Sequence, residues 1–573
     1  MPVQNSEIAD IFYEIADLLE IEGANQFRVR AYRDAARTIE GYPRRINEMT
    51  ENDESLEEIP GIGEDLANKI EEIVKTGNLV FYEKLLARTP QSLLKLLDIS
   101  GLGPKRVQQL FQELDITNLE ELRAAIEDGQ VAELDGFGAK TVDNILKALE
   151  SESLEEERTR LDIAEQFVEP LVEYLQAIQS VTKVTVAGSY RRRKATVGDL
   201  DIIATSKEGA SITEAFVKFD SVAEILSQGD TKASVKLRSG LQVDLRVVPE
   251  ESYGAALLYF TGSKEHNIHL RNIAVKKDLK INEYGVFKED ERILGQSEEE
   301  IYAHFDMAFI EPELRKDTGE IEAALKHSLP DLLRRDDIRG DLQMHTNESD
   351  GHHSLAEMAQ SAEALGYDYI AITDHTSYIG VTQGLEAEDV AAYIEKIDKF
   401  NNNHDGVVVL KGVEADIHED GSLDLPNEVL QEMDVVLGAI HSHFTLDEHE
   451  QTERVLKAMD NRYMNILAHP TTRRIGSRGP IKLDLERLMQ GAVDRGCYFE
   501  INASPERLDL WDQYIRLAGE LGLKLVISTD AHRKSSLNNM KYGVYQARRG
   551  WAEASQVLNT RSLSELQKLL KRD

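Results

Sequence analysis

Cysteine is almost absent from this chain of 573 residues, because Cys497 is the only one. An internal disulfide framework is therefore excluded, and a reducing compartment fits the sequence. No apolar run approaches the ~20 residues of a membrane-spanning helix. The first six residues, Met-Pro-Val-Gln-Asn-Ser, lack the basic and apolar regions of a secretion signal. We expect a soluble, cytoplasmic protein with no membrane partner.

Positive charge is also scarce, since 66 lysines and arginines stand against 104 acidic residues and give a net charge of −38. Nucleic-acid-binding proteins are usually basic. The balance is different between residues 181 and 250, where 11 lysines and arginines outnumber 9 acidic residues. Any anionic partner must therefore be held by local charge, metal ions and backbone N–H groups. The length predicts several domains.

A turn suited to phosphate groups follows the β-branched segment 183–187, which we expect to be a strand. Gly188 and Ser189 offer backbone N–H groups and a hydroxyl to phosphate oxygens. The basic run 191–194, which contains Arg192, adds positive charge where a triphosphate would lie. The pattern indicates a nucleotidyltransferase site.

Three aspartates complete this pattern. Asp199 and Asp201 share one face of the next predicted strand because side chains alternate, and Asp244 lies in a neighbouring predicted strand, 241–248. Such carboxylates can hold two Mg²⁺ or Mn²⁺ ions, which activate an attacking 3′-hydroxyl and brace the phosphoryl group. The alternative, an exposed strand face, fits Asp-x-Asp alone but not the glycine turn with its arginines.

A Gly-x-Gly pattern occurs three times before this region, each time leading into a helical pattern. The glycines are Gly61 and Gly63, Gly101 and Gly103, and Gly136 and Gly138. Paired glycines permit a tight turn and leave unpaired N–H groups at the start of a helix, where phosphate can bind. The repeats predict helix–hairpin–helix elements that grip DNA backbone without reading its sequence.

The C-terminal third carries a second metal signature. His, Asp and Glu residues directly follow short apolar segments such as 369–372 and 524–527. Strand ends converge on one rim of an α/β barrel. Imidazole and carboxylate ligands suit Mn²⁺, Zn²⁺ or Fe²⁺, which activate water for attack on a phosphodiester.

These residues resemble the family X DNA polymerases, the group that includes DNA polymerase β. The resemblance implies that Tyr259, Phe260 and Gly262 border the nucleotide, that Asn267 meets the base edge and that Arg271 lies in the minor groove.

The N-terminal residues also resemble the 5′-deoxyribose-phosphate lyase region of this family. The resemblance implies that Lys69 is the Schiff-base nucleophile and that Arg28 and Tyr32 bind DNA at the 5′-phosphate. Asp65 departs from the family pattern, which has a basic residue there. A lysine attacks an aldehyde only when neutral, and the alternative is a surface lysine on a DNA-binding helix.

The C-terminal third resembles the PHP (polymerase and histidinol phosphatase) domain, a distorted (β/α)₇ barrel that holds two or three ions. Eight ligands carry over: His345, Asp350, His375, Glu414, His441, His469, Asp530 and His532. Gln343 departs from the family pattern, which has a histidine there. A neutral amide is a weaker ligand, so we expect one ion to bind less tightly or through water.

The expected fold is multidomain, α+β and α/β. The order is a lyase-like helix–hairpin–helix domain (1–85), a fingers-like region with two more hairpins (86–150), a nucleotidyltransferase palm (151–251), a thumb (252–315), a linker (316–339) and the PHP barrel (340–573).

The combined order resembles the bacterial and archaeal family X polymerases with a PHP domain. It implies a monomeric, template-dependent polymerase that takes dNTPs and fills short gaps in primed DNA during base-excision or end-joining repair. It also implies a Mn²⁺-dependent 3′→5′ exonuclease and an AP endonuclease in the barrel. Two alternatives stay open: a catalytically inactive barrel, and a template-independent nucleotidyltransferase.

Overall fold

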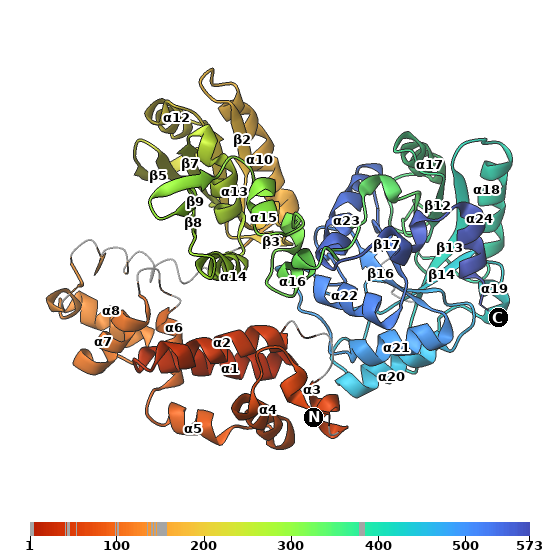
Figure 1. Cartoon of the computed structure of the whole chain (residues 1–573). Coiled ribbons are helices and arrows are strands. Elements are labelled where there is room, and N and C mark those ends of the chain that lie inside the picture. The colour runs from red at the N-terminus through yellow and green to blue at the C-terminus, as the bar shows by residue number, and fades with distance from the viewer. Residues whose placement is uncertain are drawn as a thin grey trace. The chain divides into compact units, whose positions relative to one another are not determined.

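The structure, a computed structural model, describes residues 5–40, 42, 46–52, 54–97, 99, 102–134, 136–138, 141–142, 145, 158–376 and 384–572. The chain forms two compact units, residues 1–157 and 158–573. Figure 1 shows the helices of the first unit and the sheets of the second. None of the helices in the described ranges is long and apolar enough to cross a membrane.

The first unit is helical and contains two hydrophobic cores. One core lies under α1 and α2, where Phe12 meets the Tyr32 ring edge-on at 5.4 Å, and the other lies under α7 and α8. Its helices are α1 (Asn5–Ile21), α2 (Gln26–Glu40), α3 (Ile46–Glu51), α4 (Glu64–Thr76), α5 (Val80–Leu86), α6 (Leu94–Leu97), α7 (Pro104–Leu114) and α8 (Leu119–Glu127).

The second unit begins with a five-stranded palm sheet of order β2-β4-β7-β6-β5, in which only β4 and β7 run parallel. β6 and β7 alternate buried and more exposed residues, as strands of a half-buried sheet do. The elements are β1 (Thr159–Arg160), α10 (Leu161–Gln176), β2 (Lys183–Val186), α11 (Gly188–Arg191), β3 (Thr196–Val197), β4 (Asp199–Thr205), α12 (Gly209–Phe216), β5 (Val222–Gln228), β6 (Lys232–Leu237) and β7 (Gln242–Val248).

The thumb follows as helices with a small antiparallel sheet of order β10-β9-β8. Its α15 begins at a capping box made by Ser297 and Glu300. The elements are α13 (Tyr253–Thr261), α14 (Lys264–Val275), β8 (Lys280–Asn282), β9 (Gly285–Lys288), β10 (Glu291–Leu294), α15 (Glu298–His304) and α16 (Glu320–Leu325).

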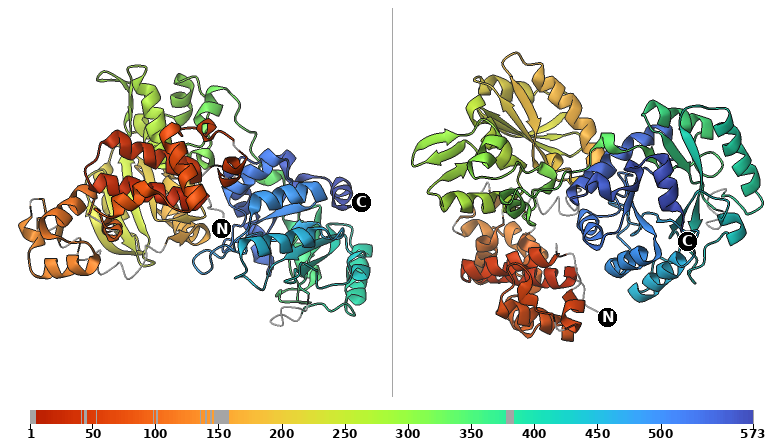
Figure 2. Two further views of the ribbon diagram at one scale, coloured as in Figure 1. Left: turned by 90° about the horizontal axis from the view of Figure 1, so that it is seen from below. Right: turned by 45° about the vertical axis from the view of Figure 1, so that its right-hand side comes forward.

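The rest of the second unit is a barrel of seven parallel strands in sequential order from β11 to β17. A parallel bridge between Met344 and Ala531 joins the two ends of the sheet. Helices surround the strands (Figure 1, Figure 2). The elements are β11 (Gly340–Asp341), α17 (Leu355–Ala364), β12 (Tyr369–Ile372), α18 (Val390–Asn402), β13 (Val408–Asp416), α19 (Asn427–Leu430), β14 (Val435–Ala439), α20 (Glu448–Met459), β15 (Ile466–Leu467), α21 (Leu485–Arg495), β16 (Tyr498–Asn502), α22 (Asp512–Leu521), β17 (Leu525–Ser528), α23 (Met540–Arg549) and α24 (Leu563–Leu570).

This architecture confirms the predicted fold class. The strands of the barrel are buried on both faces, so they are nearly continuous apolar runs such as Tyr-Ile-Ala-Ile in β12 and Leu-Val-Ile-Ser in β17. Polar residues of the site lie in the C-terminal halves of the strands, as Glu414 does in β13, or shortly beyond the strand ends, as His375 does after β12.

Candidate functional site

The predicted phosphate turn lies directly against the palm carboxylates. Gly188 begins α11 with φ of 60°, and a Cβ built on it would lie 2.6 Å from Oδ2 of Asp201. Only glycine allows this approach. The Ser189 hydroxyl is buried and has no hydrogen-bond partner. A buried unpaired hydroxyl is costly, and a phosphate oxygen bound at this turn would satisfy it.

The three palm aspartates meet at one edge of the sheet. Asp201 pairs in register with Asp244 across the parallel strands β4 and β7, and Asp199 lies two residues earlier on the same face. Burial, followed by the charges of Asp199 and Asp244, raises the pKa of Asp201 to about 7. A divalent cation would relieve this repulsion, so the residues fit the two-ion site predicted from the sequence.

The segment predicted to border the nucleotide lies on α13 and α14. The rings of Tyr259 and Phe260 are 5.0 Å apart, and Asn267 donates to the carbonyl of Tyr259 at 2.7 Å. Arg271 donates to the carbonyl of Asn267 at 3.2 Å, and Gly262 has φ of 70°.

Arg192 links this segment to the phosphate turn, because its guanidinium donates to the carbonyl of Thr261. The structure therefore brings together the turn, the carboxylates and the α13–α14 segment.

Glu414 on β13 is the central residue of the barrel site. Its carboxylate is buried and lies 3.3 Å from His345 Nε2, 3.5 Å from His375 Nδ1, 3.4 Å from His441 Nε2 and 3.0 Å from His469 Nε2. The four histidines follow β11, β12, β14 and β15, and Glu414 lies two residues before the end of β13. The predicted convergence of strand ends therefore brings the imidazoles around one carboxylate.

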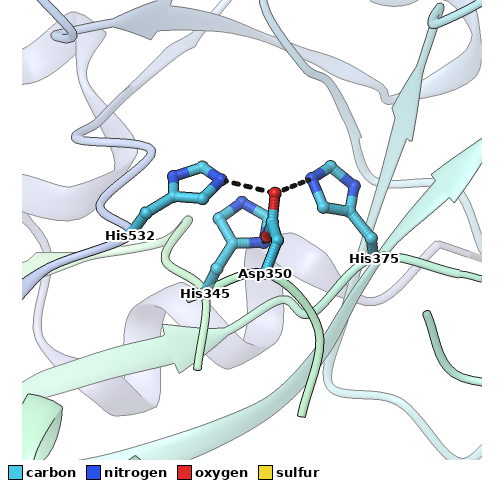
Figure 3. A group of neighbouring side chains, drawn as sticks. All are labelled: His345, Asp350, His375 and His532. Atoms are coloured by element: carbon cyan, nitrogen blue, oxygen red, sulfur yellow. Dashed lines mark ion pairs between the residues drawn. The ribbon is translucent and has the colours of Figure 1, made fainter. Parts of the chain in front are cut away.

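Three overlapping groups of possible ligands surround Glu414 within the described chain. Their members are His345, Asp350, His375 and His532 in the first, His375, Glu414 and His441 in the second, and His345, Glu414 and Asp530 in the third. Figure 3 shows the first group, in which Asp350 lies 3.2 Å from His532 and 3.7 Å from His375. Shared ligands between neighbouring groups are the arrangement that a cluster of two or three ions needs. The palm carboxylates do not form a group this tight.

The donor atoms also fit metal ions. Nδ1 of His345 and Nδ1 of His469 are buried without a hydrogen-bond partner. Burial, with the nearby charge of Arg507 next, lowers the pKa of His469 to about 4, so its ring is neutral at pH 7. A neutral imidazole is the form that binds a metal.

Gln343 occupies the position where the family pattern has a ninth ligand. Its side chain is fully buried, and neither the oxygen nor the nitrogen of its amide has a hydrogen-bond partner. Its backbone carbonyl accepts from the N–H of Asp530 at 3.1 Å, which places it beside a predicted ligand. An amide buried in this way is stabilised if its oxygen meets a cation.

A surrounding layer of polar residues orients the predicted ligands. Asp416 lies 3.0 Å from Nδ1 of His441, and Asn502 donates to Asp530 at 3.1 Å. Glu500 accepts from the backbone N–H of His469 at 2.6 Å. Sequence reasoning missed Asp416, although its position two residues after Glu414 puts it on the same face of β13.

Arg507 is the other residue that sequence reasoning missed. Its Nε lies 3.5 Å from Oδ2 of Asp530, and its Nη1 is buried without a hydrogen-bond partner. Arg473, which follows the predicted ligand His469 in the chain, is buried and donates to the carbonyls of Arg507 and Leu508. Arg474 is exposed. Arg507 therefore lies within 3.5 Å of a predicted metal ligand.

In the first unit, the predicted lyase residues surround Phe81. The Arg28 guanidinium lies 4.8 Å and the Lys69 ammonium 5.8 Å from the centre of its ring, and Tyr32 stacks on it at 5.9 Å. Lys69 forms an ion pair with Asp65 one helical turn earlier. The ammonium of Lys69 is therefore engaged by a carboxylate at the position where the family pattern has a basic residue.

The hairpin glycines have the geometry that their repeats predict. Gly61 and Gly136 have φ of 81° and 83°, and Gly63 and Gly103 precede the first turns of α4 and α7. The carbonyl of Gly138 accepts the N–H groups of residues 141 and 142. These turns expose N–H groups that can meet DNA phosphates. The remaining predicted glycine, Gly101, lies outside the described residues.

Comparison with protein families gives five matches between residues 3 and 504. Residues 3–79 match a helix-hairpin-helix domain and residues 93–151 a SAM-like helix-hairpin-helix tandem. Residues 158–256 match the DNA polymerase beta palm, residues 256–316 the DNA polymerase beta thumb, and residues 341–504 the PHP domain.

Individual proteins are similar over the whole chain or over its parts. A DNA polymerase/3′-5′ exonuclease PolX of Bacillus subtilis is 38% identical, with 100% of both chains covered. A DNA polymerase lambda of Arabidopsis thaliana is 26% identical over 50% of this chain and 55% of its own length. A probable phosphatase of Thermoanaerobacter is 28% identical over 38% of this chain and 90% of its own.

Proposed function

The chain belongs to the family X DNA polymerases that carry a C-terminal PHP domain, and from this premise we propose that it is a template-dependent DNA polymerase with a 3′→5′ exonuclease in its barrel. The polymerase is proposed to fill short gaps in base-excision or end-joining repair. Its substrates are primed or gapped DNA and dNTPs.

One observation carries the polymerase proposal: the phosphate turn touches the aspartates. Gly188 lies against Asp201, which is the register partner of Asp244. We propose that the palm carboxylates hold Mg²⁺ or Mn²⁺. A nucleoside triphosphate on this turn would have its α-phosphate beside them. Such ions lower the barrier to in-line displacement of pyrophosphate. The chain contributes the turn that would position the triphosphate, and Arg192 in the same segment adds positive charge there.

The polymerase proposal is tested on a duplex with a one-nucleotide gap. We expect wild-type protein to add one nucleotide, chosen by the template base, in all four template contexts, and Asp244→Asn to lose extension. Asp230→Asn is the matched control, because Asp230 is exposed in the turn between β5 and β6. Equal addition of all four nucleotides, or extension of a single-stranded primer, would favour the template-independent alternative.

The exonuclease proposal rests on Glu414 and the imidazoles around it. We propose that Mn²⁺, Zn²⁺ or Fe²⁺ ions bind the three overlapping groups and supply activated water for phosphodiester hydrolysis. Asp416 and Glu500 would hold the ligands in place. The same chemistry would serve an AP endonuclease, because both reactions hydrolyse a DNA phosphodiester.

The barrel proposal is tested with a 3′-mismatched primer in Mn²⁺ without dNTPs. We expect wild-type protein to release the terminal nucleotide and Asp530→Asn to lose this release. Asp420→Asn, an exposed aspartate of the barrel, is the matched control. Trimming that survives Asp530→Asn would support the alternative in which the barrel is inactive and only structural.

A further inference from the structure

Arg549, the last residue of the barrel helix α23, reaches the phosphate turn of the palm. Its side chain is 6% exposed. Nη1 donates to the backbone carbonyl of Arg192 at 2.6 Å, and Nη2 lies 2.6 Å from Oδ2 of Asp512 at the start of α22. A residue of one predicted active domain therefore bonds directly to the nucleotide-binding turn of the other.

The contact satisfies a group that the turn itself leaves unpaired. The carbonyl of Arg192 lies at the C-terminal end of the short helix α11, where carbonyls have no intrahelical donor. A cation at this end also meets the negative pole of the helix. The guanidinium of Arg549 supplies both the donor and the charge.

The next residue of the turn is held by the same barrel helix. Arg193 has φ of 54°, a strained value for a residue with a side chain. Its guanidinium lies 4.4 Å from the ring centre of Tyr545 on α23 and 5.4 Å from that of Tyr190 in the palm. Cation–π contacts of the guanidinium with one ring from each domain stabilise this conformation of Arg193.

The side chains of Arg191 and Arg192 reach the nucleotide segment, whereas the backbone carbonyl of Arg192 faces the barrel. Arg191 pairs with Glu298 at 2.5 Å and donates to the hydroxyl of Thr261 at 2.7 Å. Arg192 donates to the carbonyl of Thr261. Burial, with the charge of Arg549 next, lowers the pKa of Arg192 to about 10. Anionic phosphate oxygens would relieve this crowding of positive charge.

Asp512 keeps Arg549 in its orientation. It also pairs with Lys316, at the end of the thumb, at 2.7 Å. Although burial opposes ionisation, Arg549 and Lys316 hold the pKa of Asp512 below its usual range. Asp512 is therefore charged at neutral pH and anchors one edge of the Arg549 guanidinium, which leaves the other edge for the palm.

We propose that the barrel forms part of the nucleotide site of the polymerase, with Arg549 as a positioning residue that fixes the turn 188–194 for the dNTP triphosphate. Tyr545 and Asp512 support this role. The inference rests on the proposed polymerase function. It adds that dNTP binding in the palm depends on side chains of the barrel that have no part in barrel hydrolysis.

The test compares Arg549→Met with Arg548→Met in steady-state gap filling by the full-length protein. Arg548 is the matched control: it is the preceding residue of α23 and bonds to Glu313 and to the carbonyl of Leu333, not to the turn. We expect Arg549→Met to raise the KM for dNTP about tenfold, because the triphosphate turn loses its alignment. The KM for gapped DNA and the rate of barrel trimming should stay at wild-type values. A KM for dNTP equal to that of wild type or of Arg548→Met would overturn the inference.

Two further variants separate positioning from a general loss of folding. A merely structural role would lower kcat and trimming together by reducing the folded fraction, and it would leave the KM for dNTP unchanged. If Arg549→Met unfolds, Arg549→Lys and Tyr545→Leu decide: a raised KM for dNTP with intact trimming supports the inference, and an unchanged KM refutes it. Absence of extension by wild-type protein would instead refute the proposed polymerase function.

Discussion

Single buried charges decide what each site can do. Glu414 has no exposed surface and four imidazoles beside its carboxylate. Burial alone would raise its pKa, but His375 and the other histidines hold it well below the usual range. Its carboxylate is therefore ionised at neutral pH, which is the form that a metal ion binds.

Arg507 offers a prediction at this scale. Its Nε lies 3.5 Å from Oδ2 of the predicted ligand Asp530, and its Nη1 has no hydrogen-bond partner and would be available to a phosphate oxygen. We expect Arg507→Met to lower single-turnover trimming roughly 100-fold to 1000-fold, the usual effect of removing one donor from a developing oxyanion. Gap filling should be unaffected.

Arg473→Met is the matched control for Arg507→Met. It removes hydrogen bonds to two buried carbonyls, so urea denaturation should show a loss of about 2 kcal/mol in the free energy of unfolding. The folded protein should still trim. Trimming at the wild-type rate by Arg507→Met would contradict the assignment of Arg507 to the phosphate.

Asp201 gives a prediction about pH. Its pKa is raised to about 7 in the folded protein, against 3.8 for an ordinary aspartate. The folded state therefore holds the proton more tightly than the unfolded state, and this group lowers stability as pH rises from about 4 to 7.

We therefore expect Asp201→Asn to stabilise the protein in EDTA at pH 8 by about 1 to 2 kcal/mol, after allowance for solvent screening, while abolishing extension. The gain should disappear at pH 4. Thermal melting of the variant and wild type at both pH values gives the sign of the stability change. A variant less stable than wild type at pH 8 would show that Asp199 and Asp244 do not destabilise the Asp201 carboxylate.

At the scale of elements, the strand–turn–helix unit of β2 and α11 places the phosphate turn against β4. The backbone N–H of Ala187 donates to the carbonyl of Asp201 at 2.7 Å, so the turn is tied to the strand that carries the carboxylates. Glycine at position 188 is what allows this approach.

Gly188→Ala should therefore abolish extension, because its Cβ would collide with Asp201 at a positive φ. Gly240→Ala is the control: it has φ of 88° in the turn between β6 and β7, with open space around it. It carries the same backbone strain, about 1 kcal/mol, without the collision. Primer extension and trimming by both variants would be measured together. Extension by Gly188→Ala at the level of Gly240→Ala would refute the steric argument.

The sequence predicts those parts of the site that follow regular elements. His375 comes just after β12 and Asp530 just after β17, so their convergence follows from the order of parallel strands. Arg507 could not be predicted, because its position depends on a loop that meets distant residues. Arg549 gives no local signal either, since its partner Arg192 lies more than 350 positions earlier.

At the scale of the whole molecule, one chain carries two chemically different centres. The palm has only carboxylates, which suit Mg²⁺ or Mn²⁺, whereas the barrel mixes imidazole and carboxylate ligands. The net charge of −38 is compatible with DNA binding because the hairpins offer backbone N–H groups and the turn 188–194 carries its own positive charge.

The most direct test of two separate centres uses a 5′-labelled primer on gapped DNA in Mn²⁺, with and without dNTPs. Wild-type protein is compared with Asp199→Ala/Asp201→Ala and with His469→Ala/Asp530→Ala. Our account predicts that the palm variant loses templated extension and still trims, and that the barrel variant loses trimming and still extends. Loss of both activities in either folded variant, or trimming that persists in the barrel variant, would contradict it.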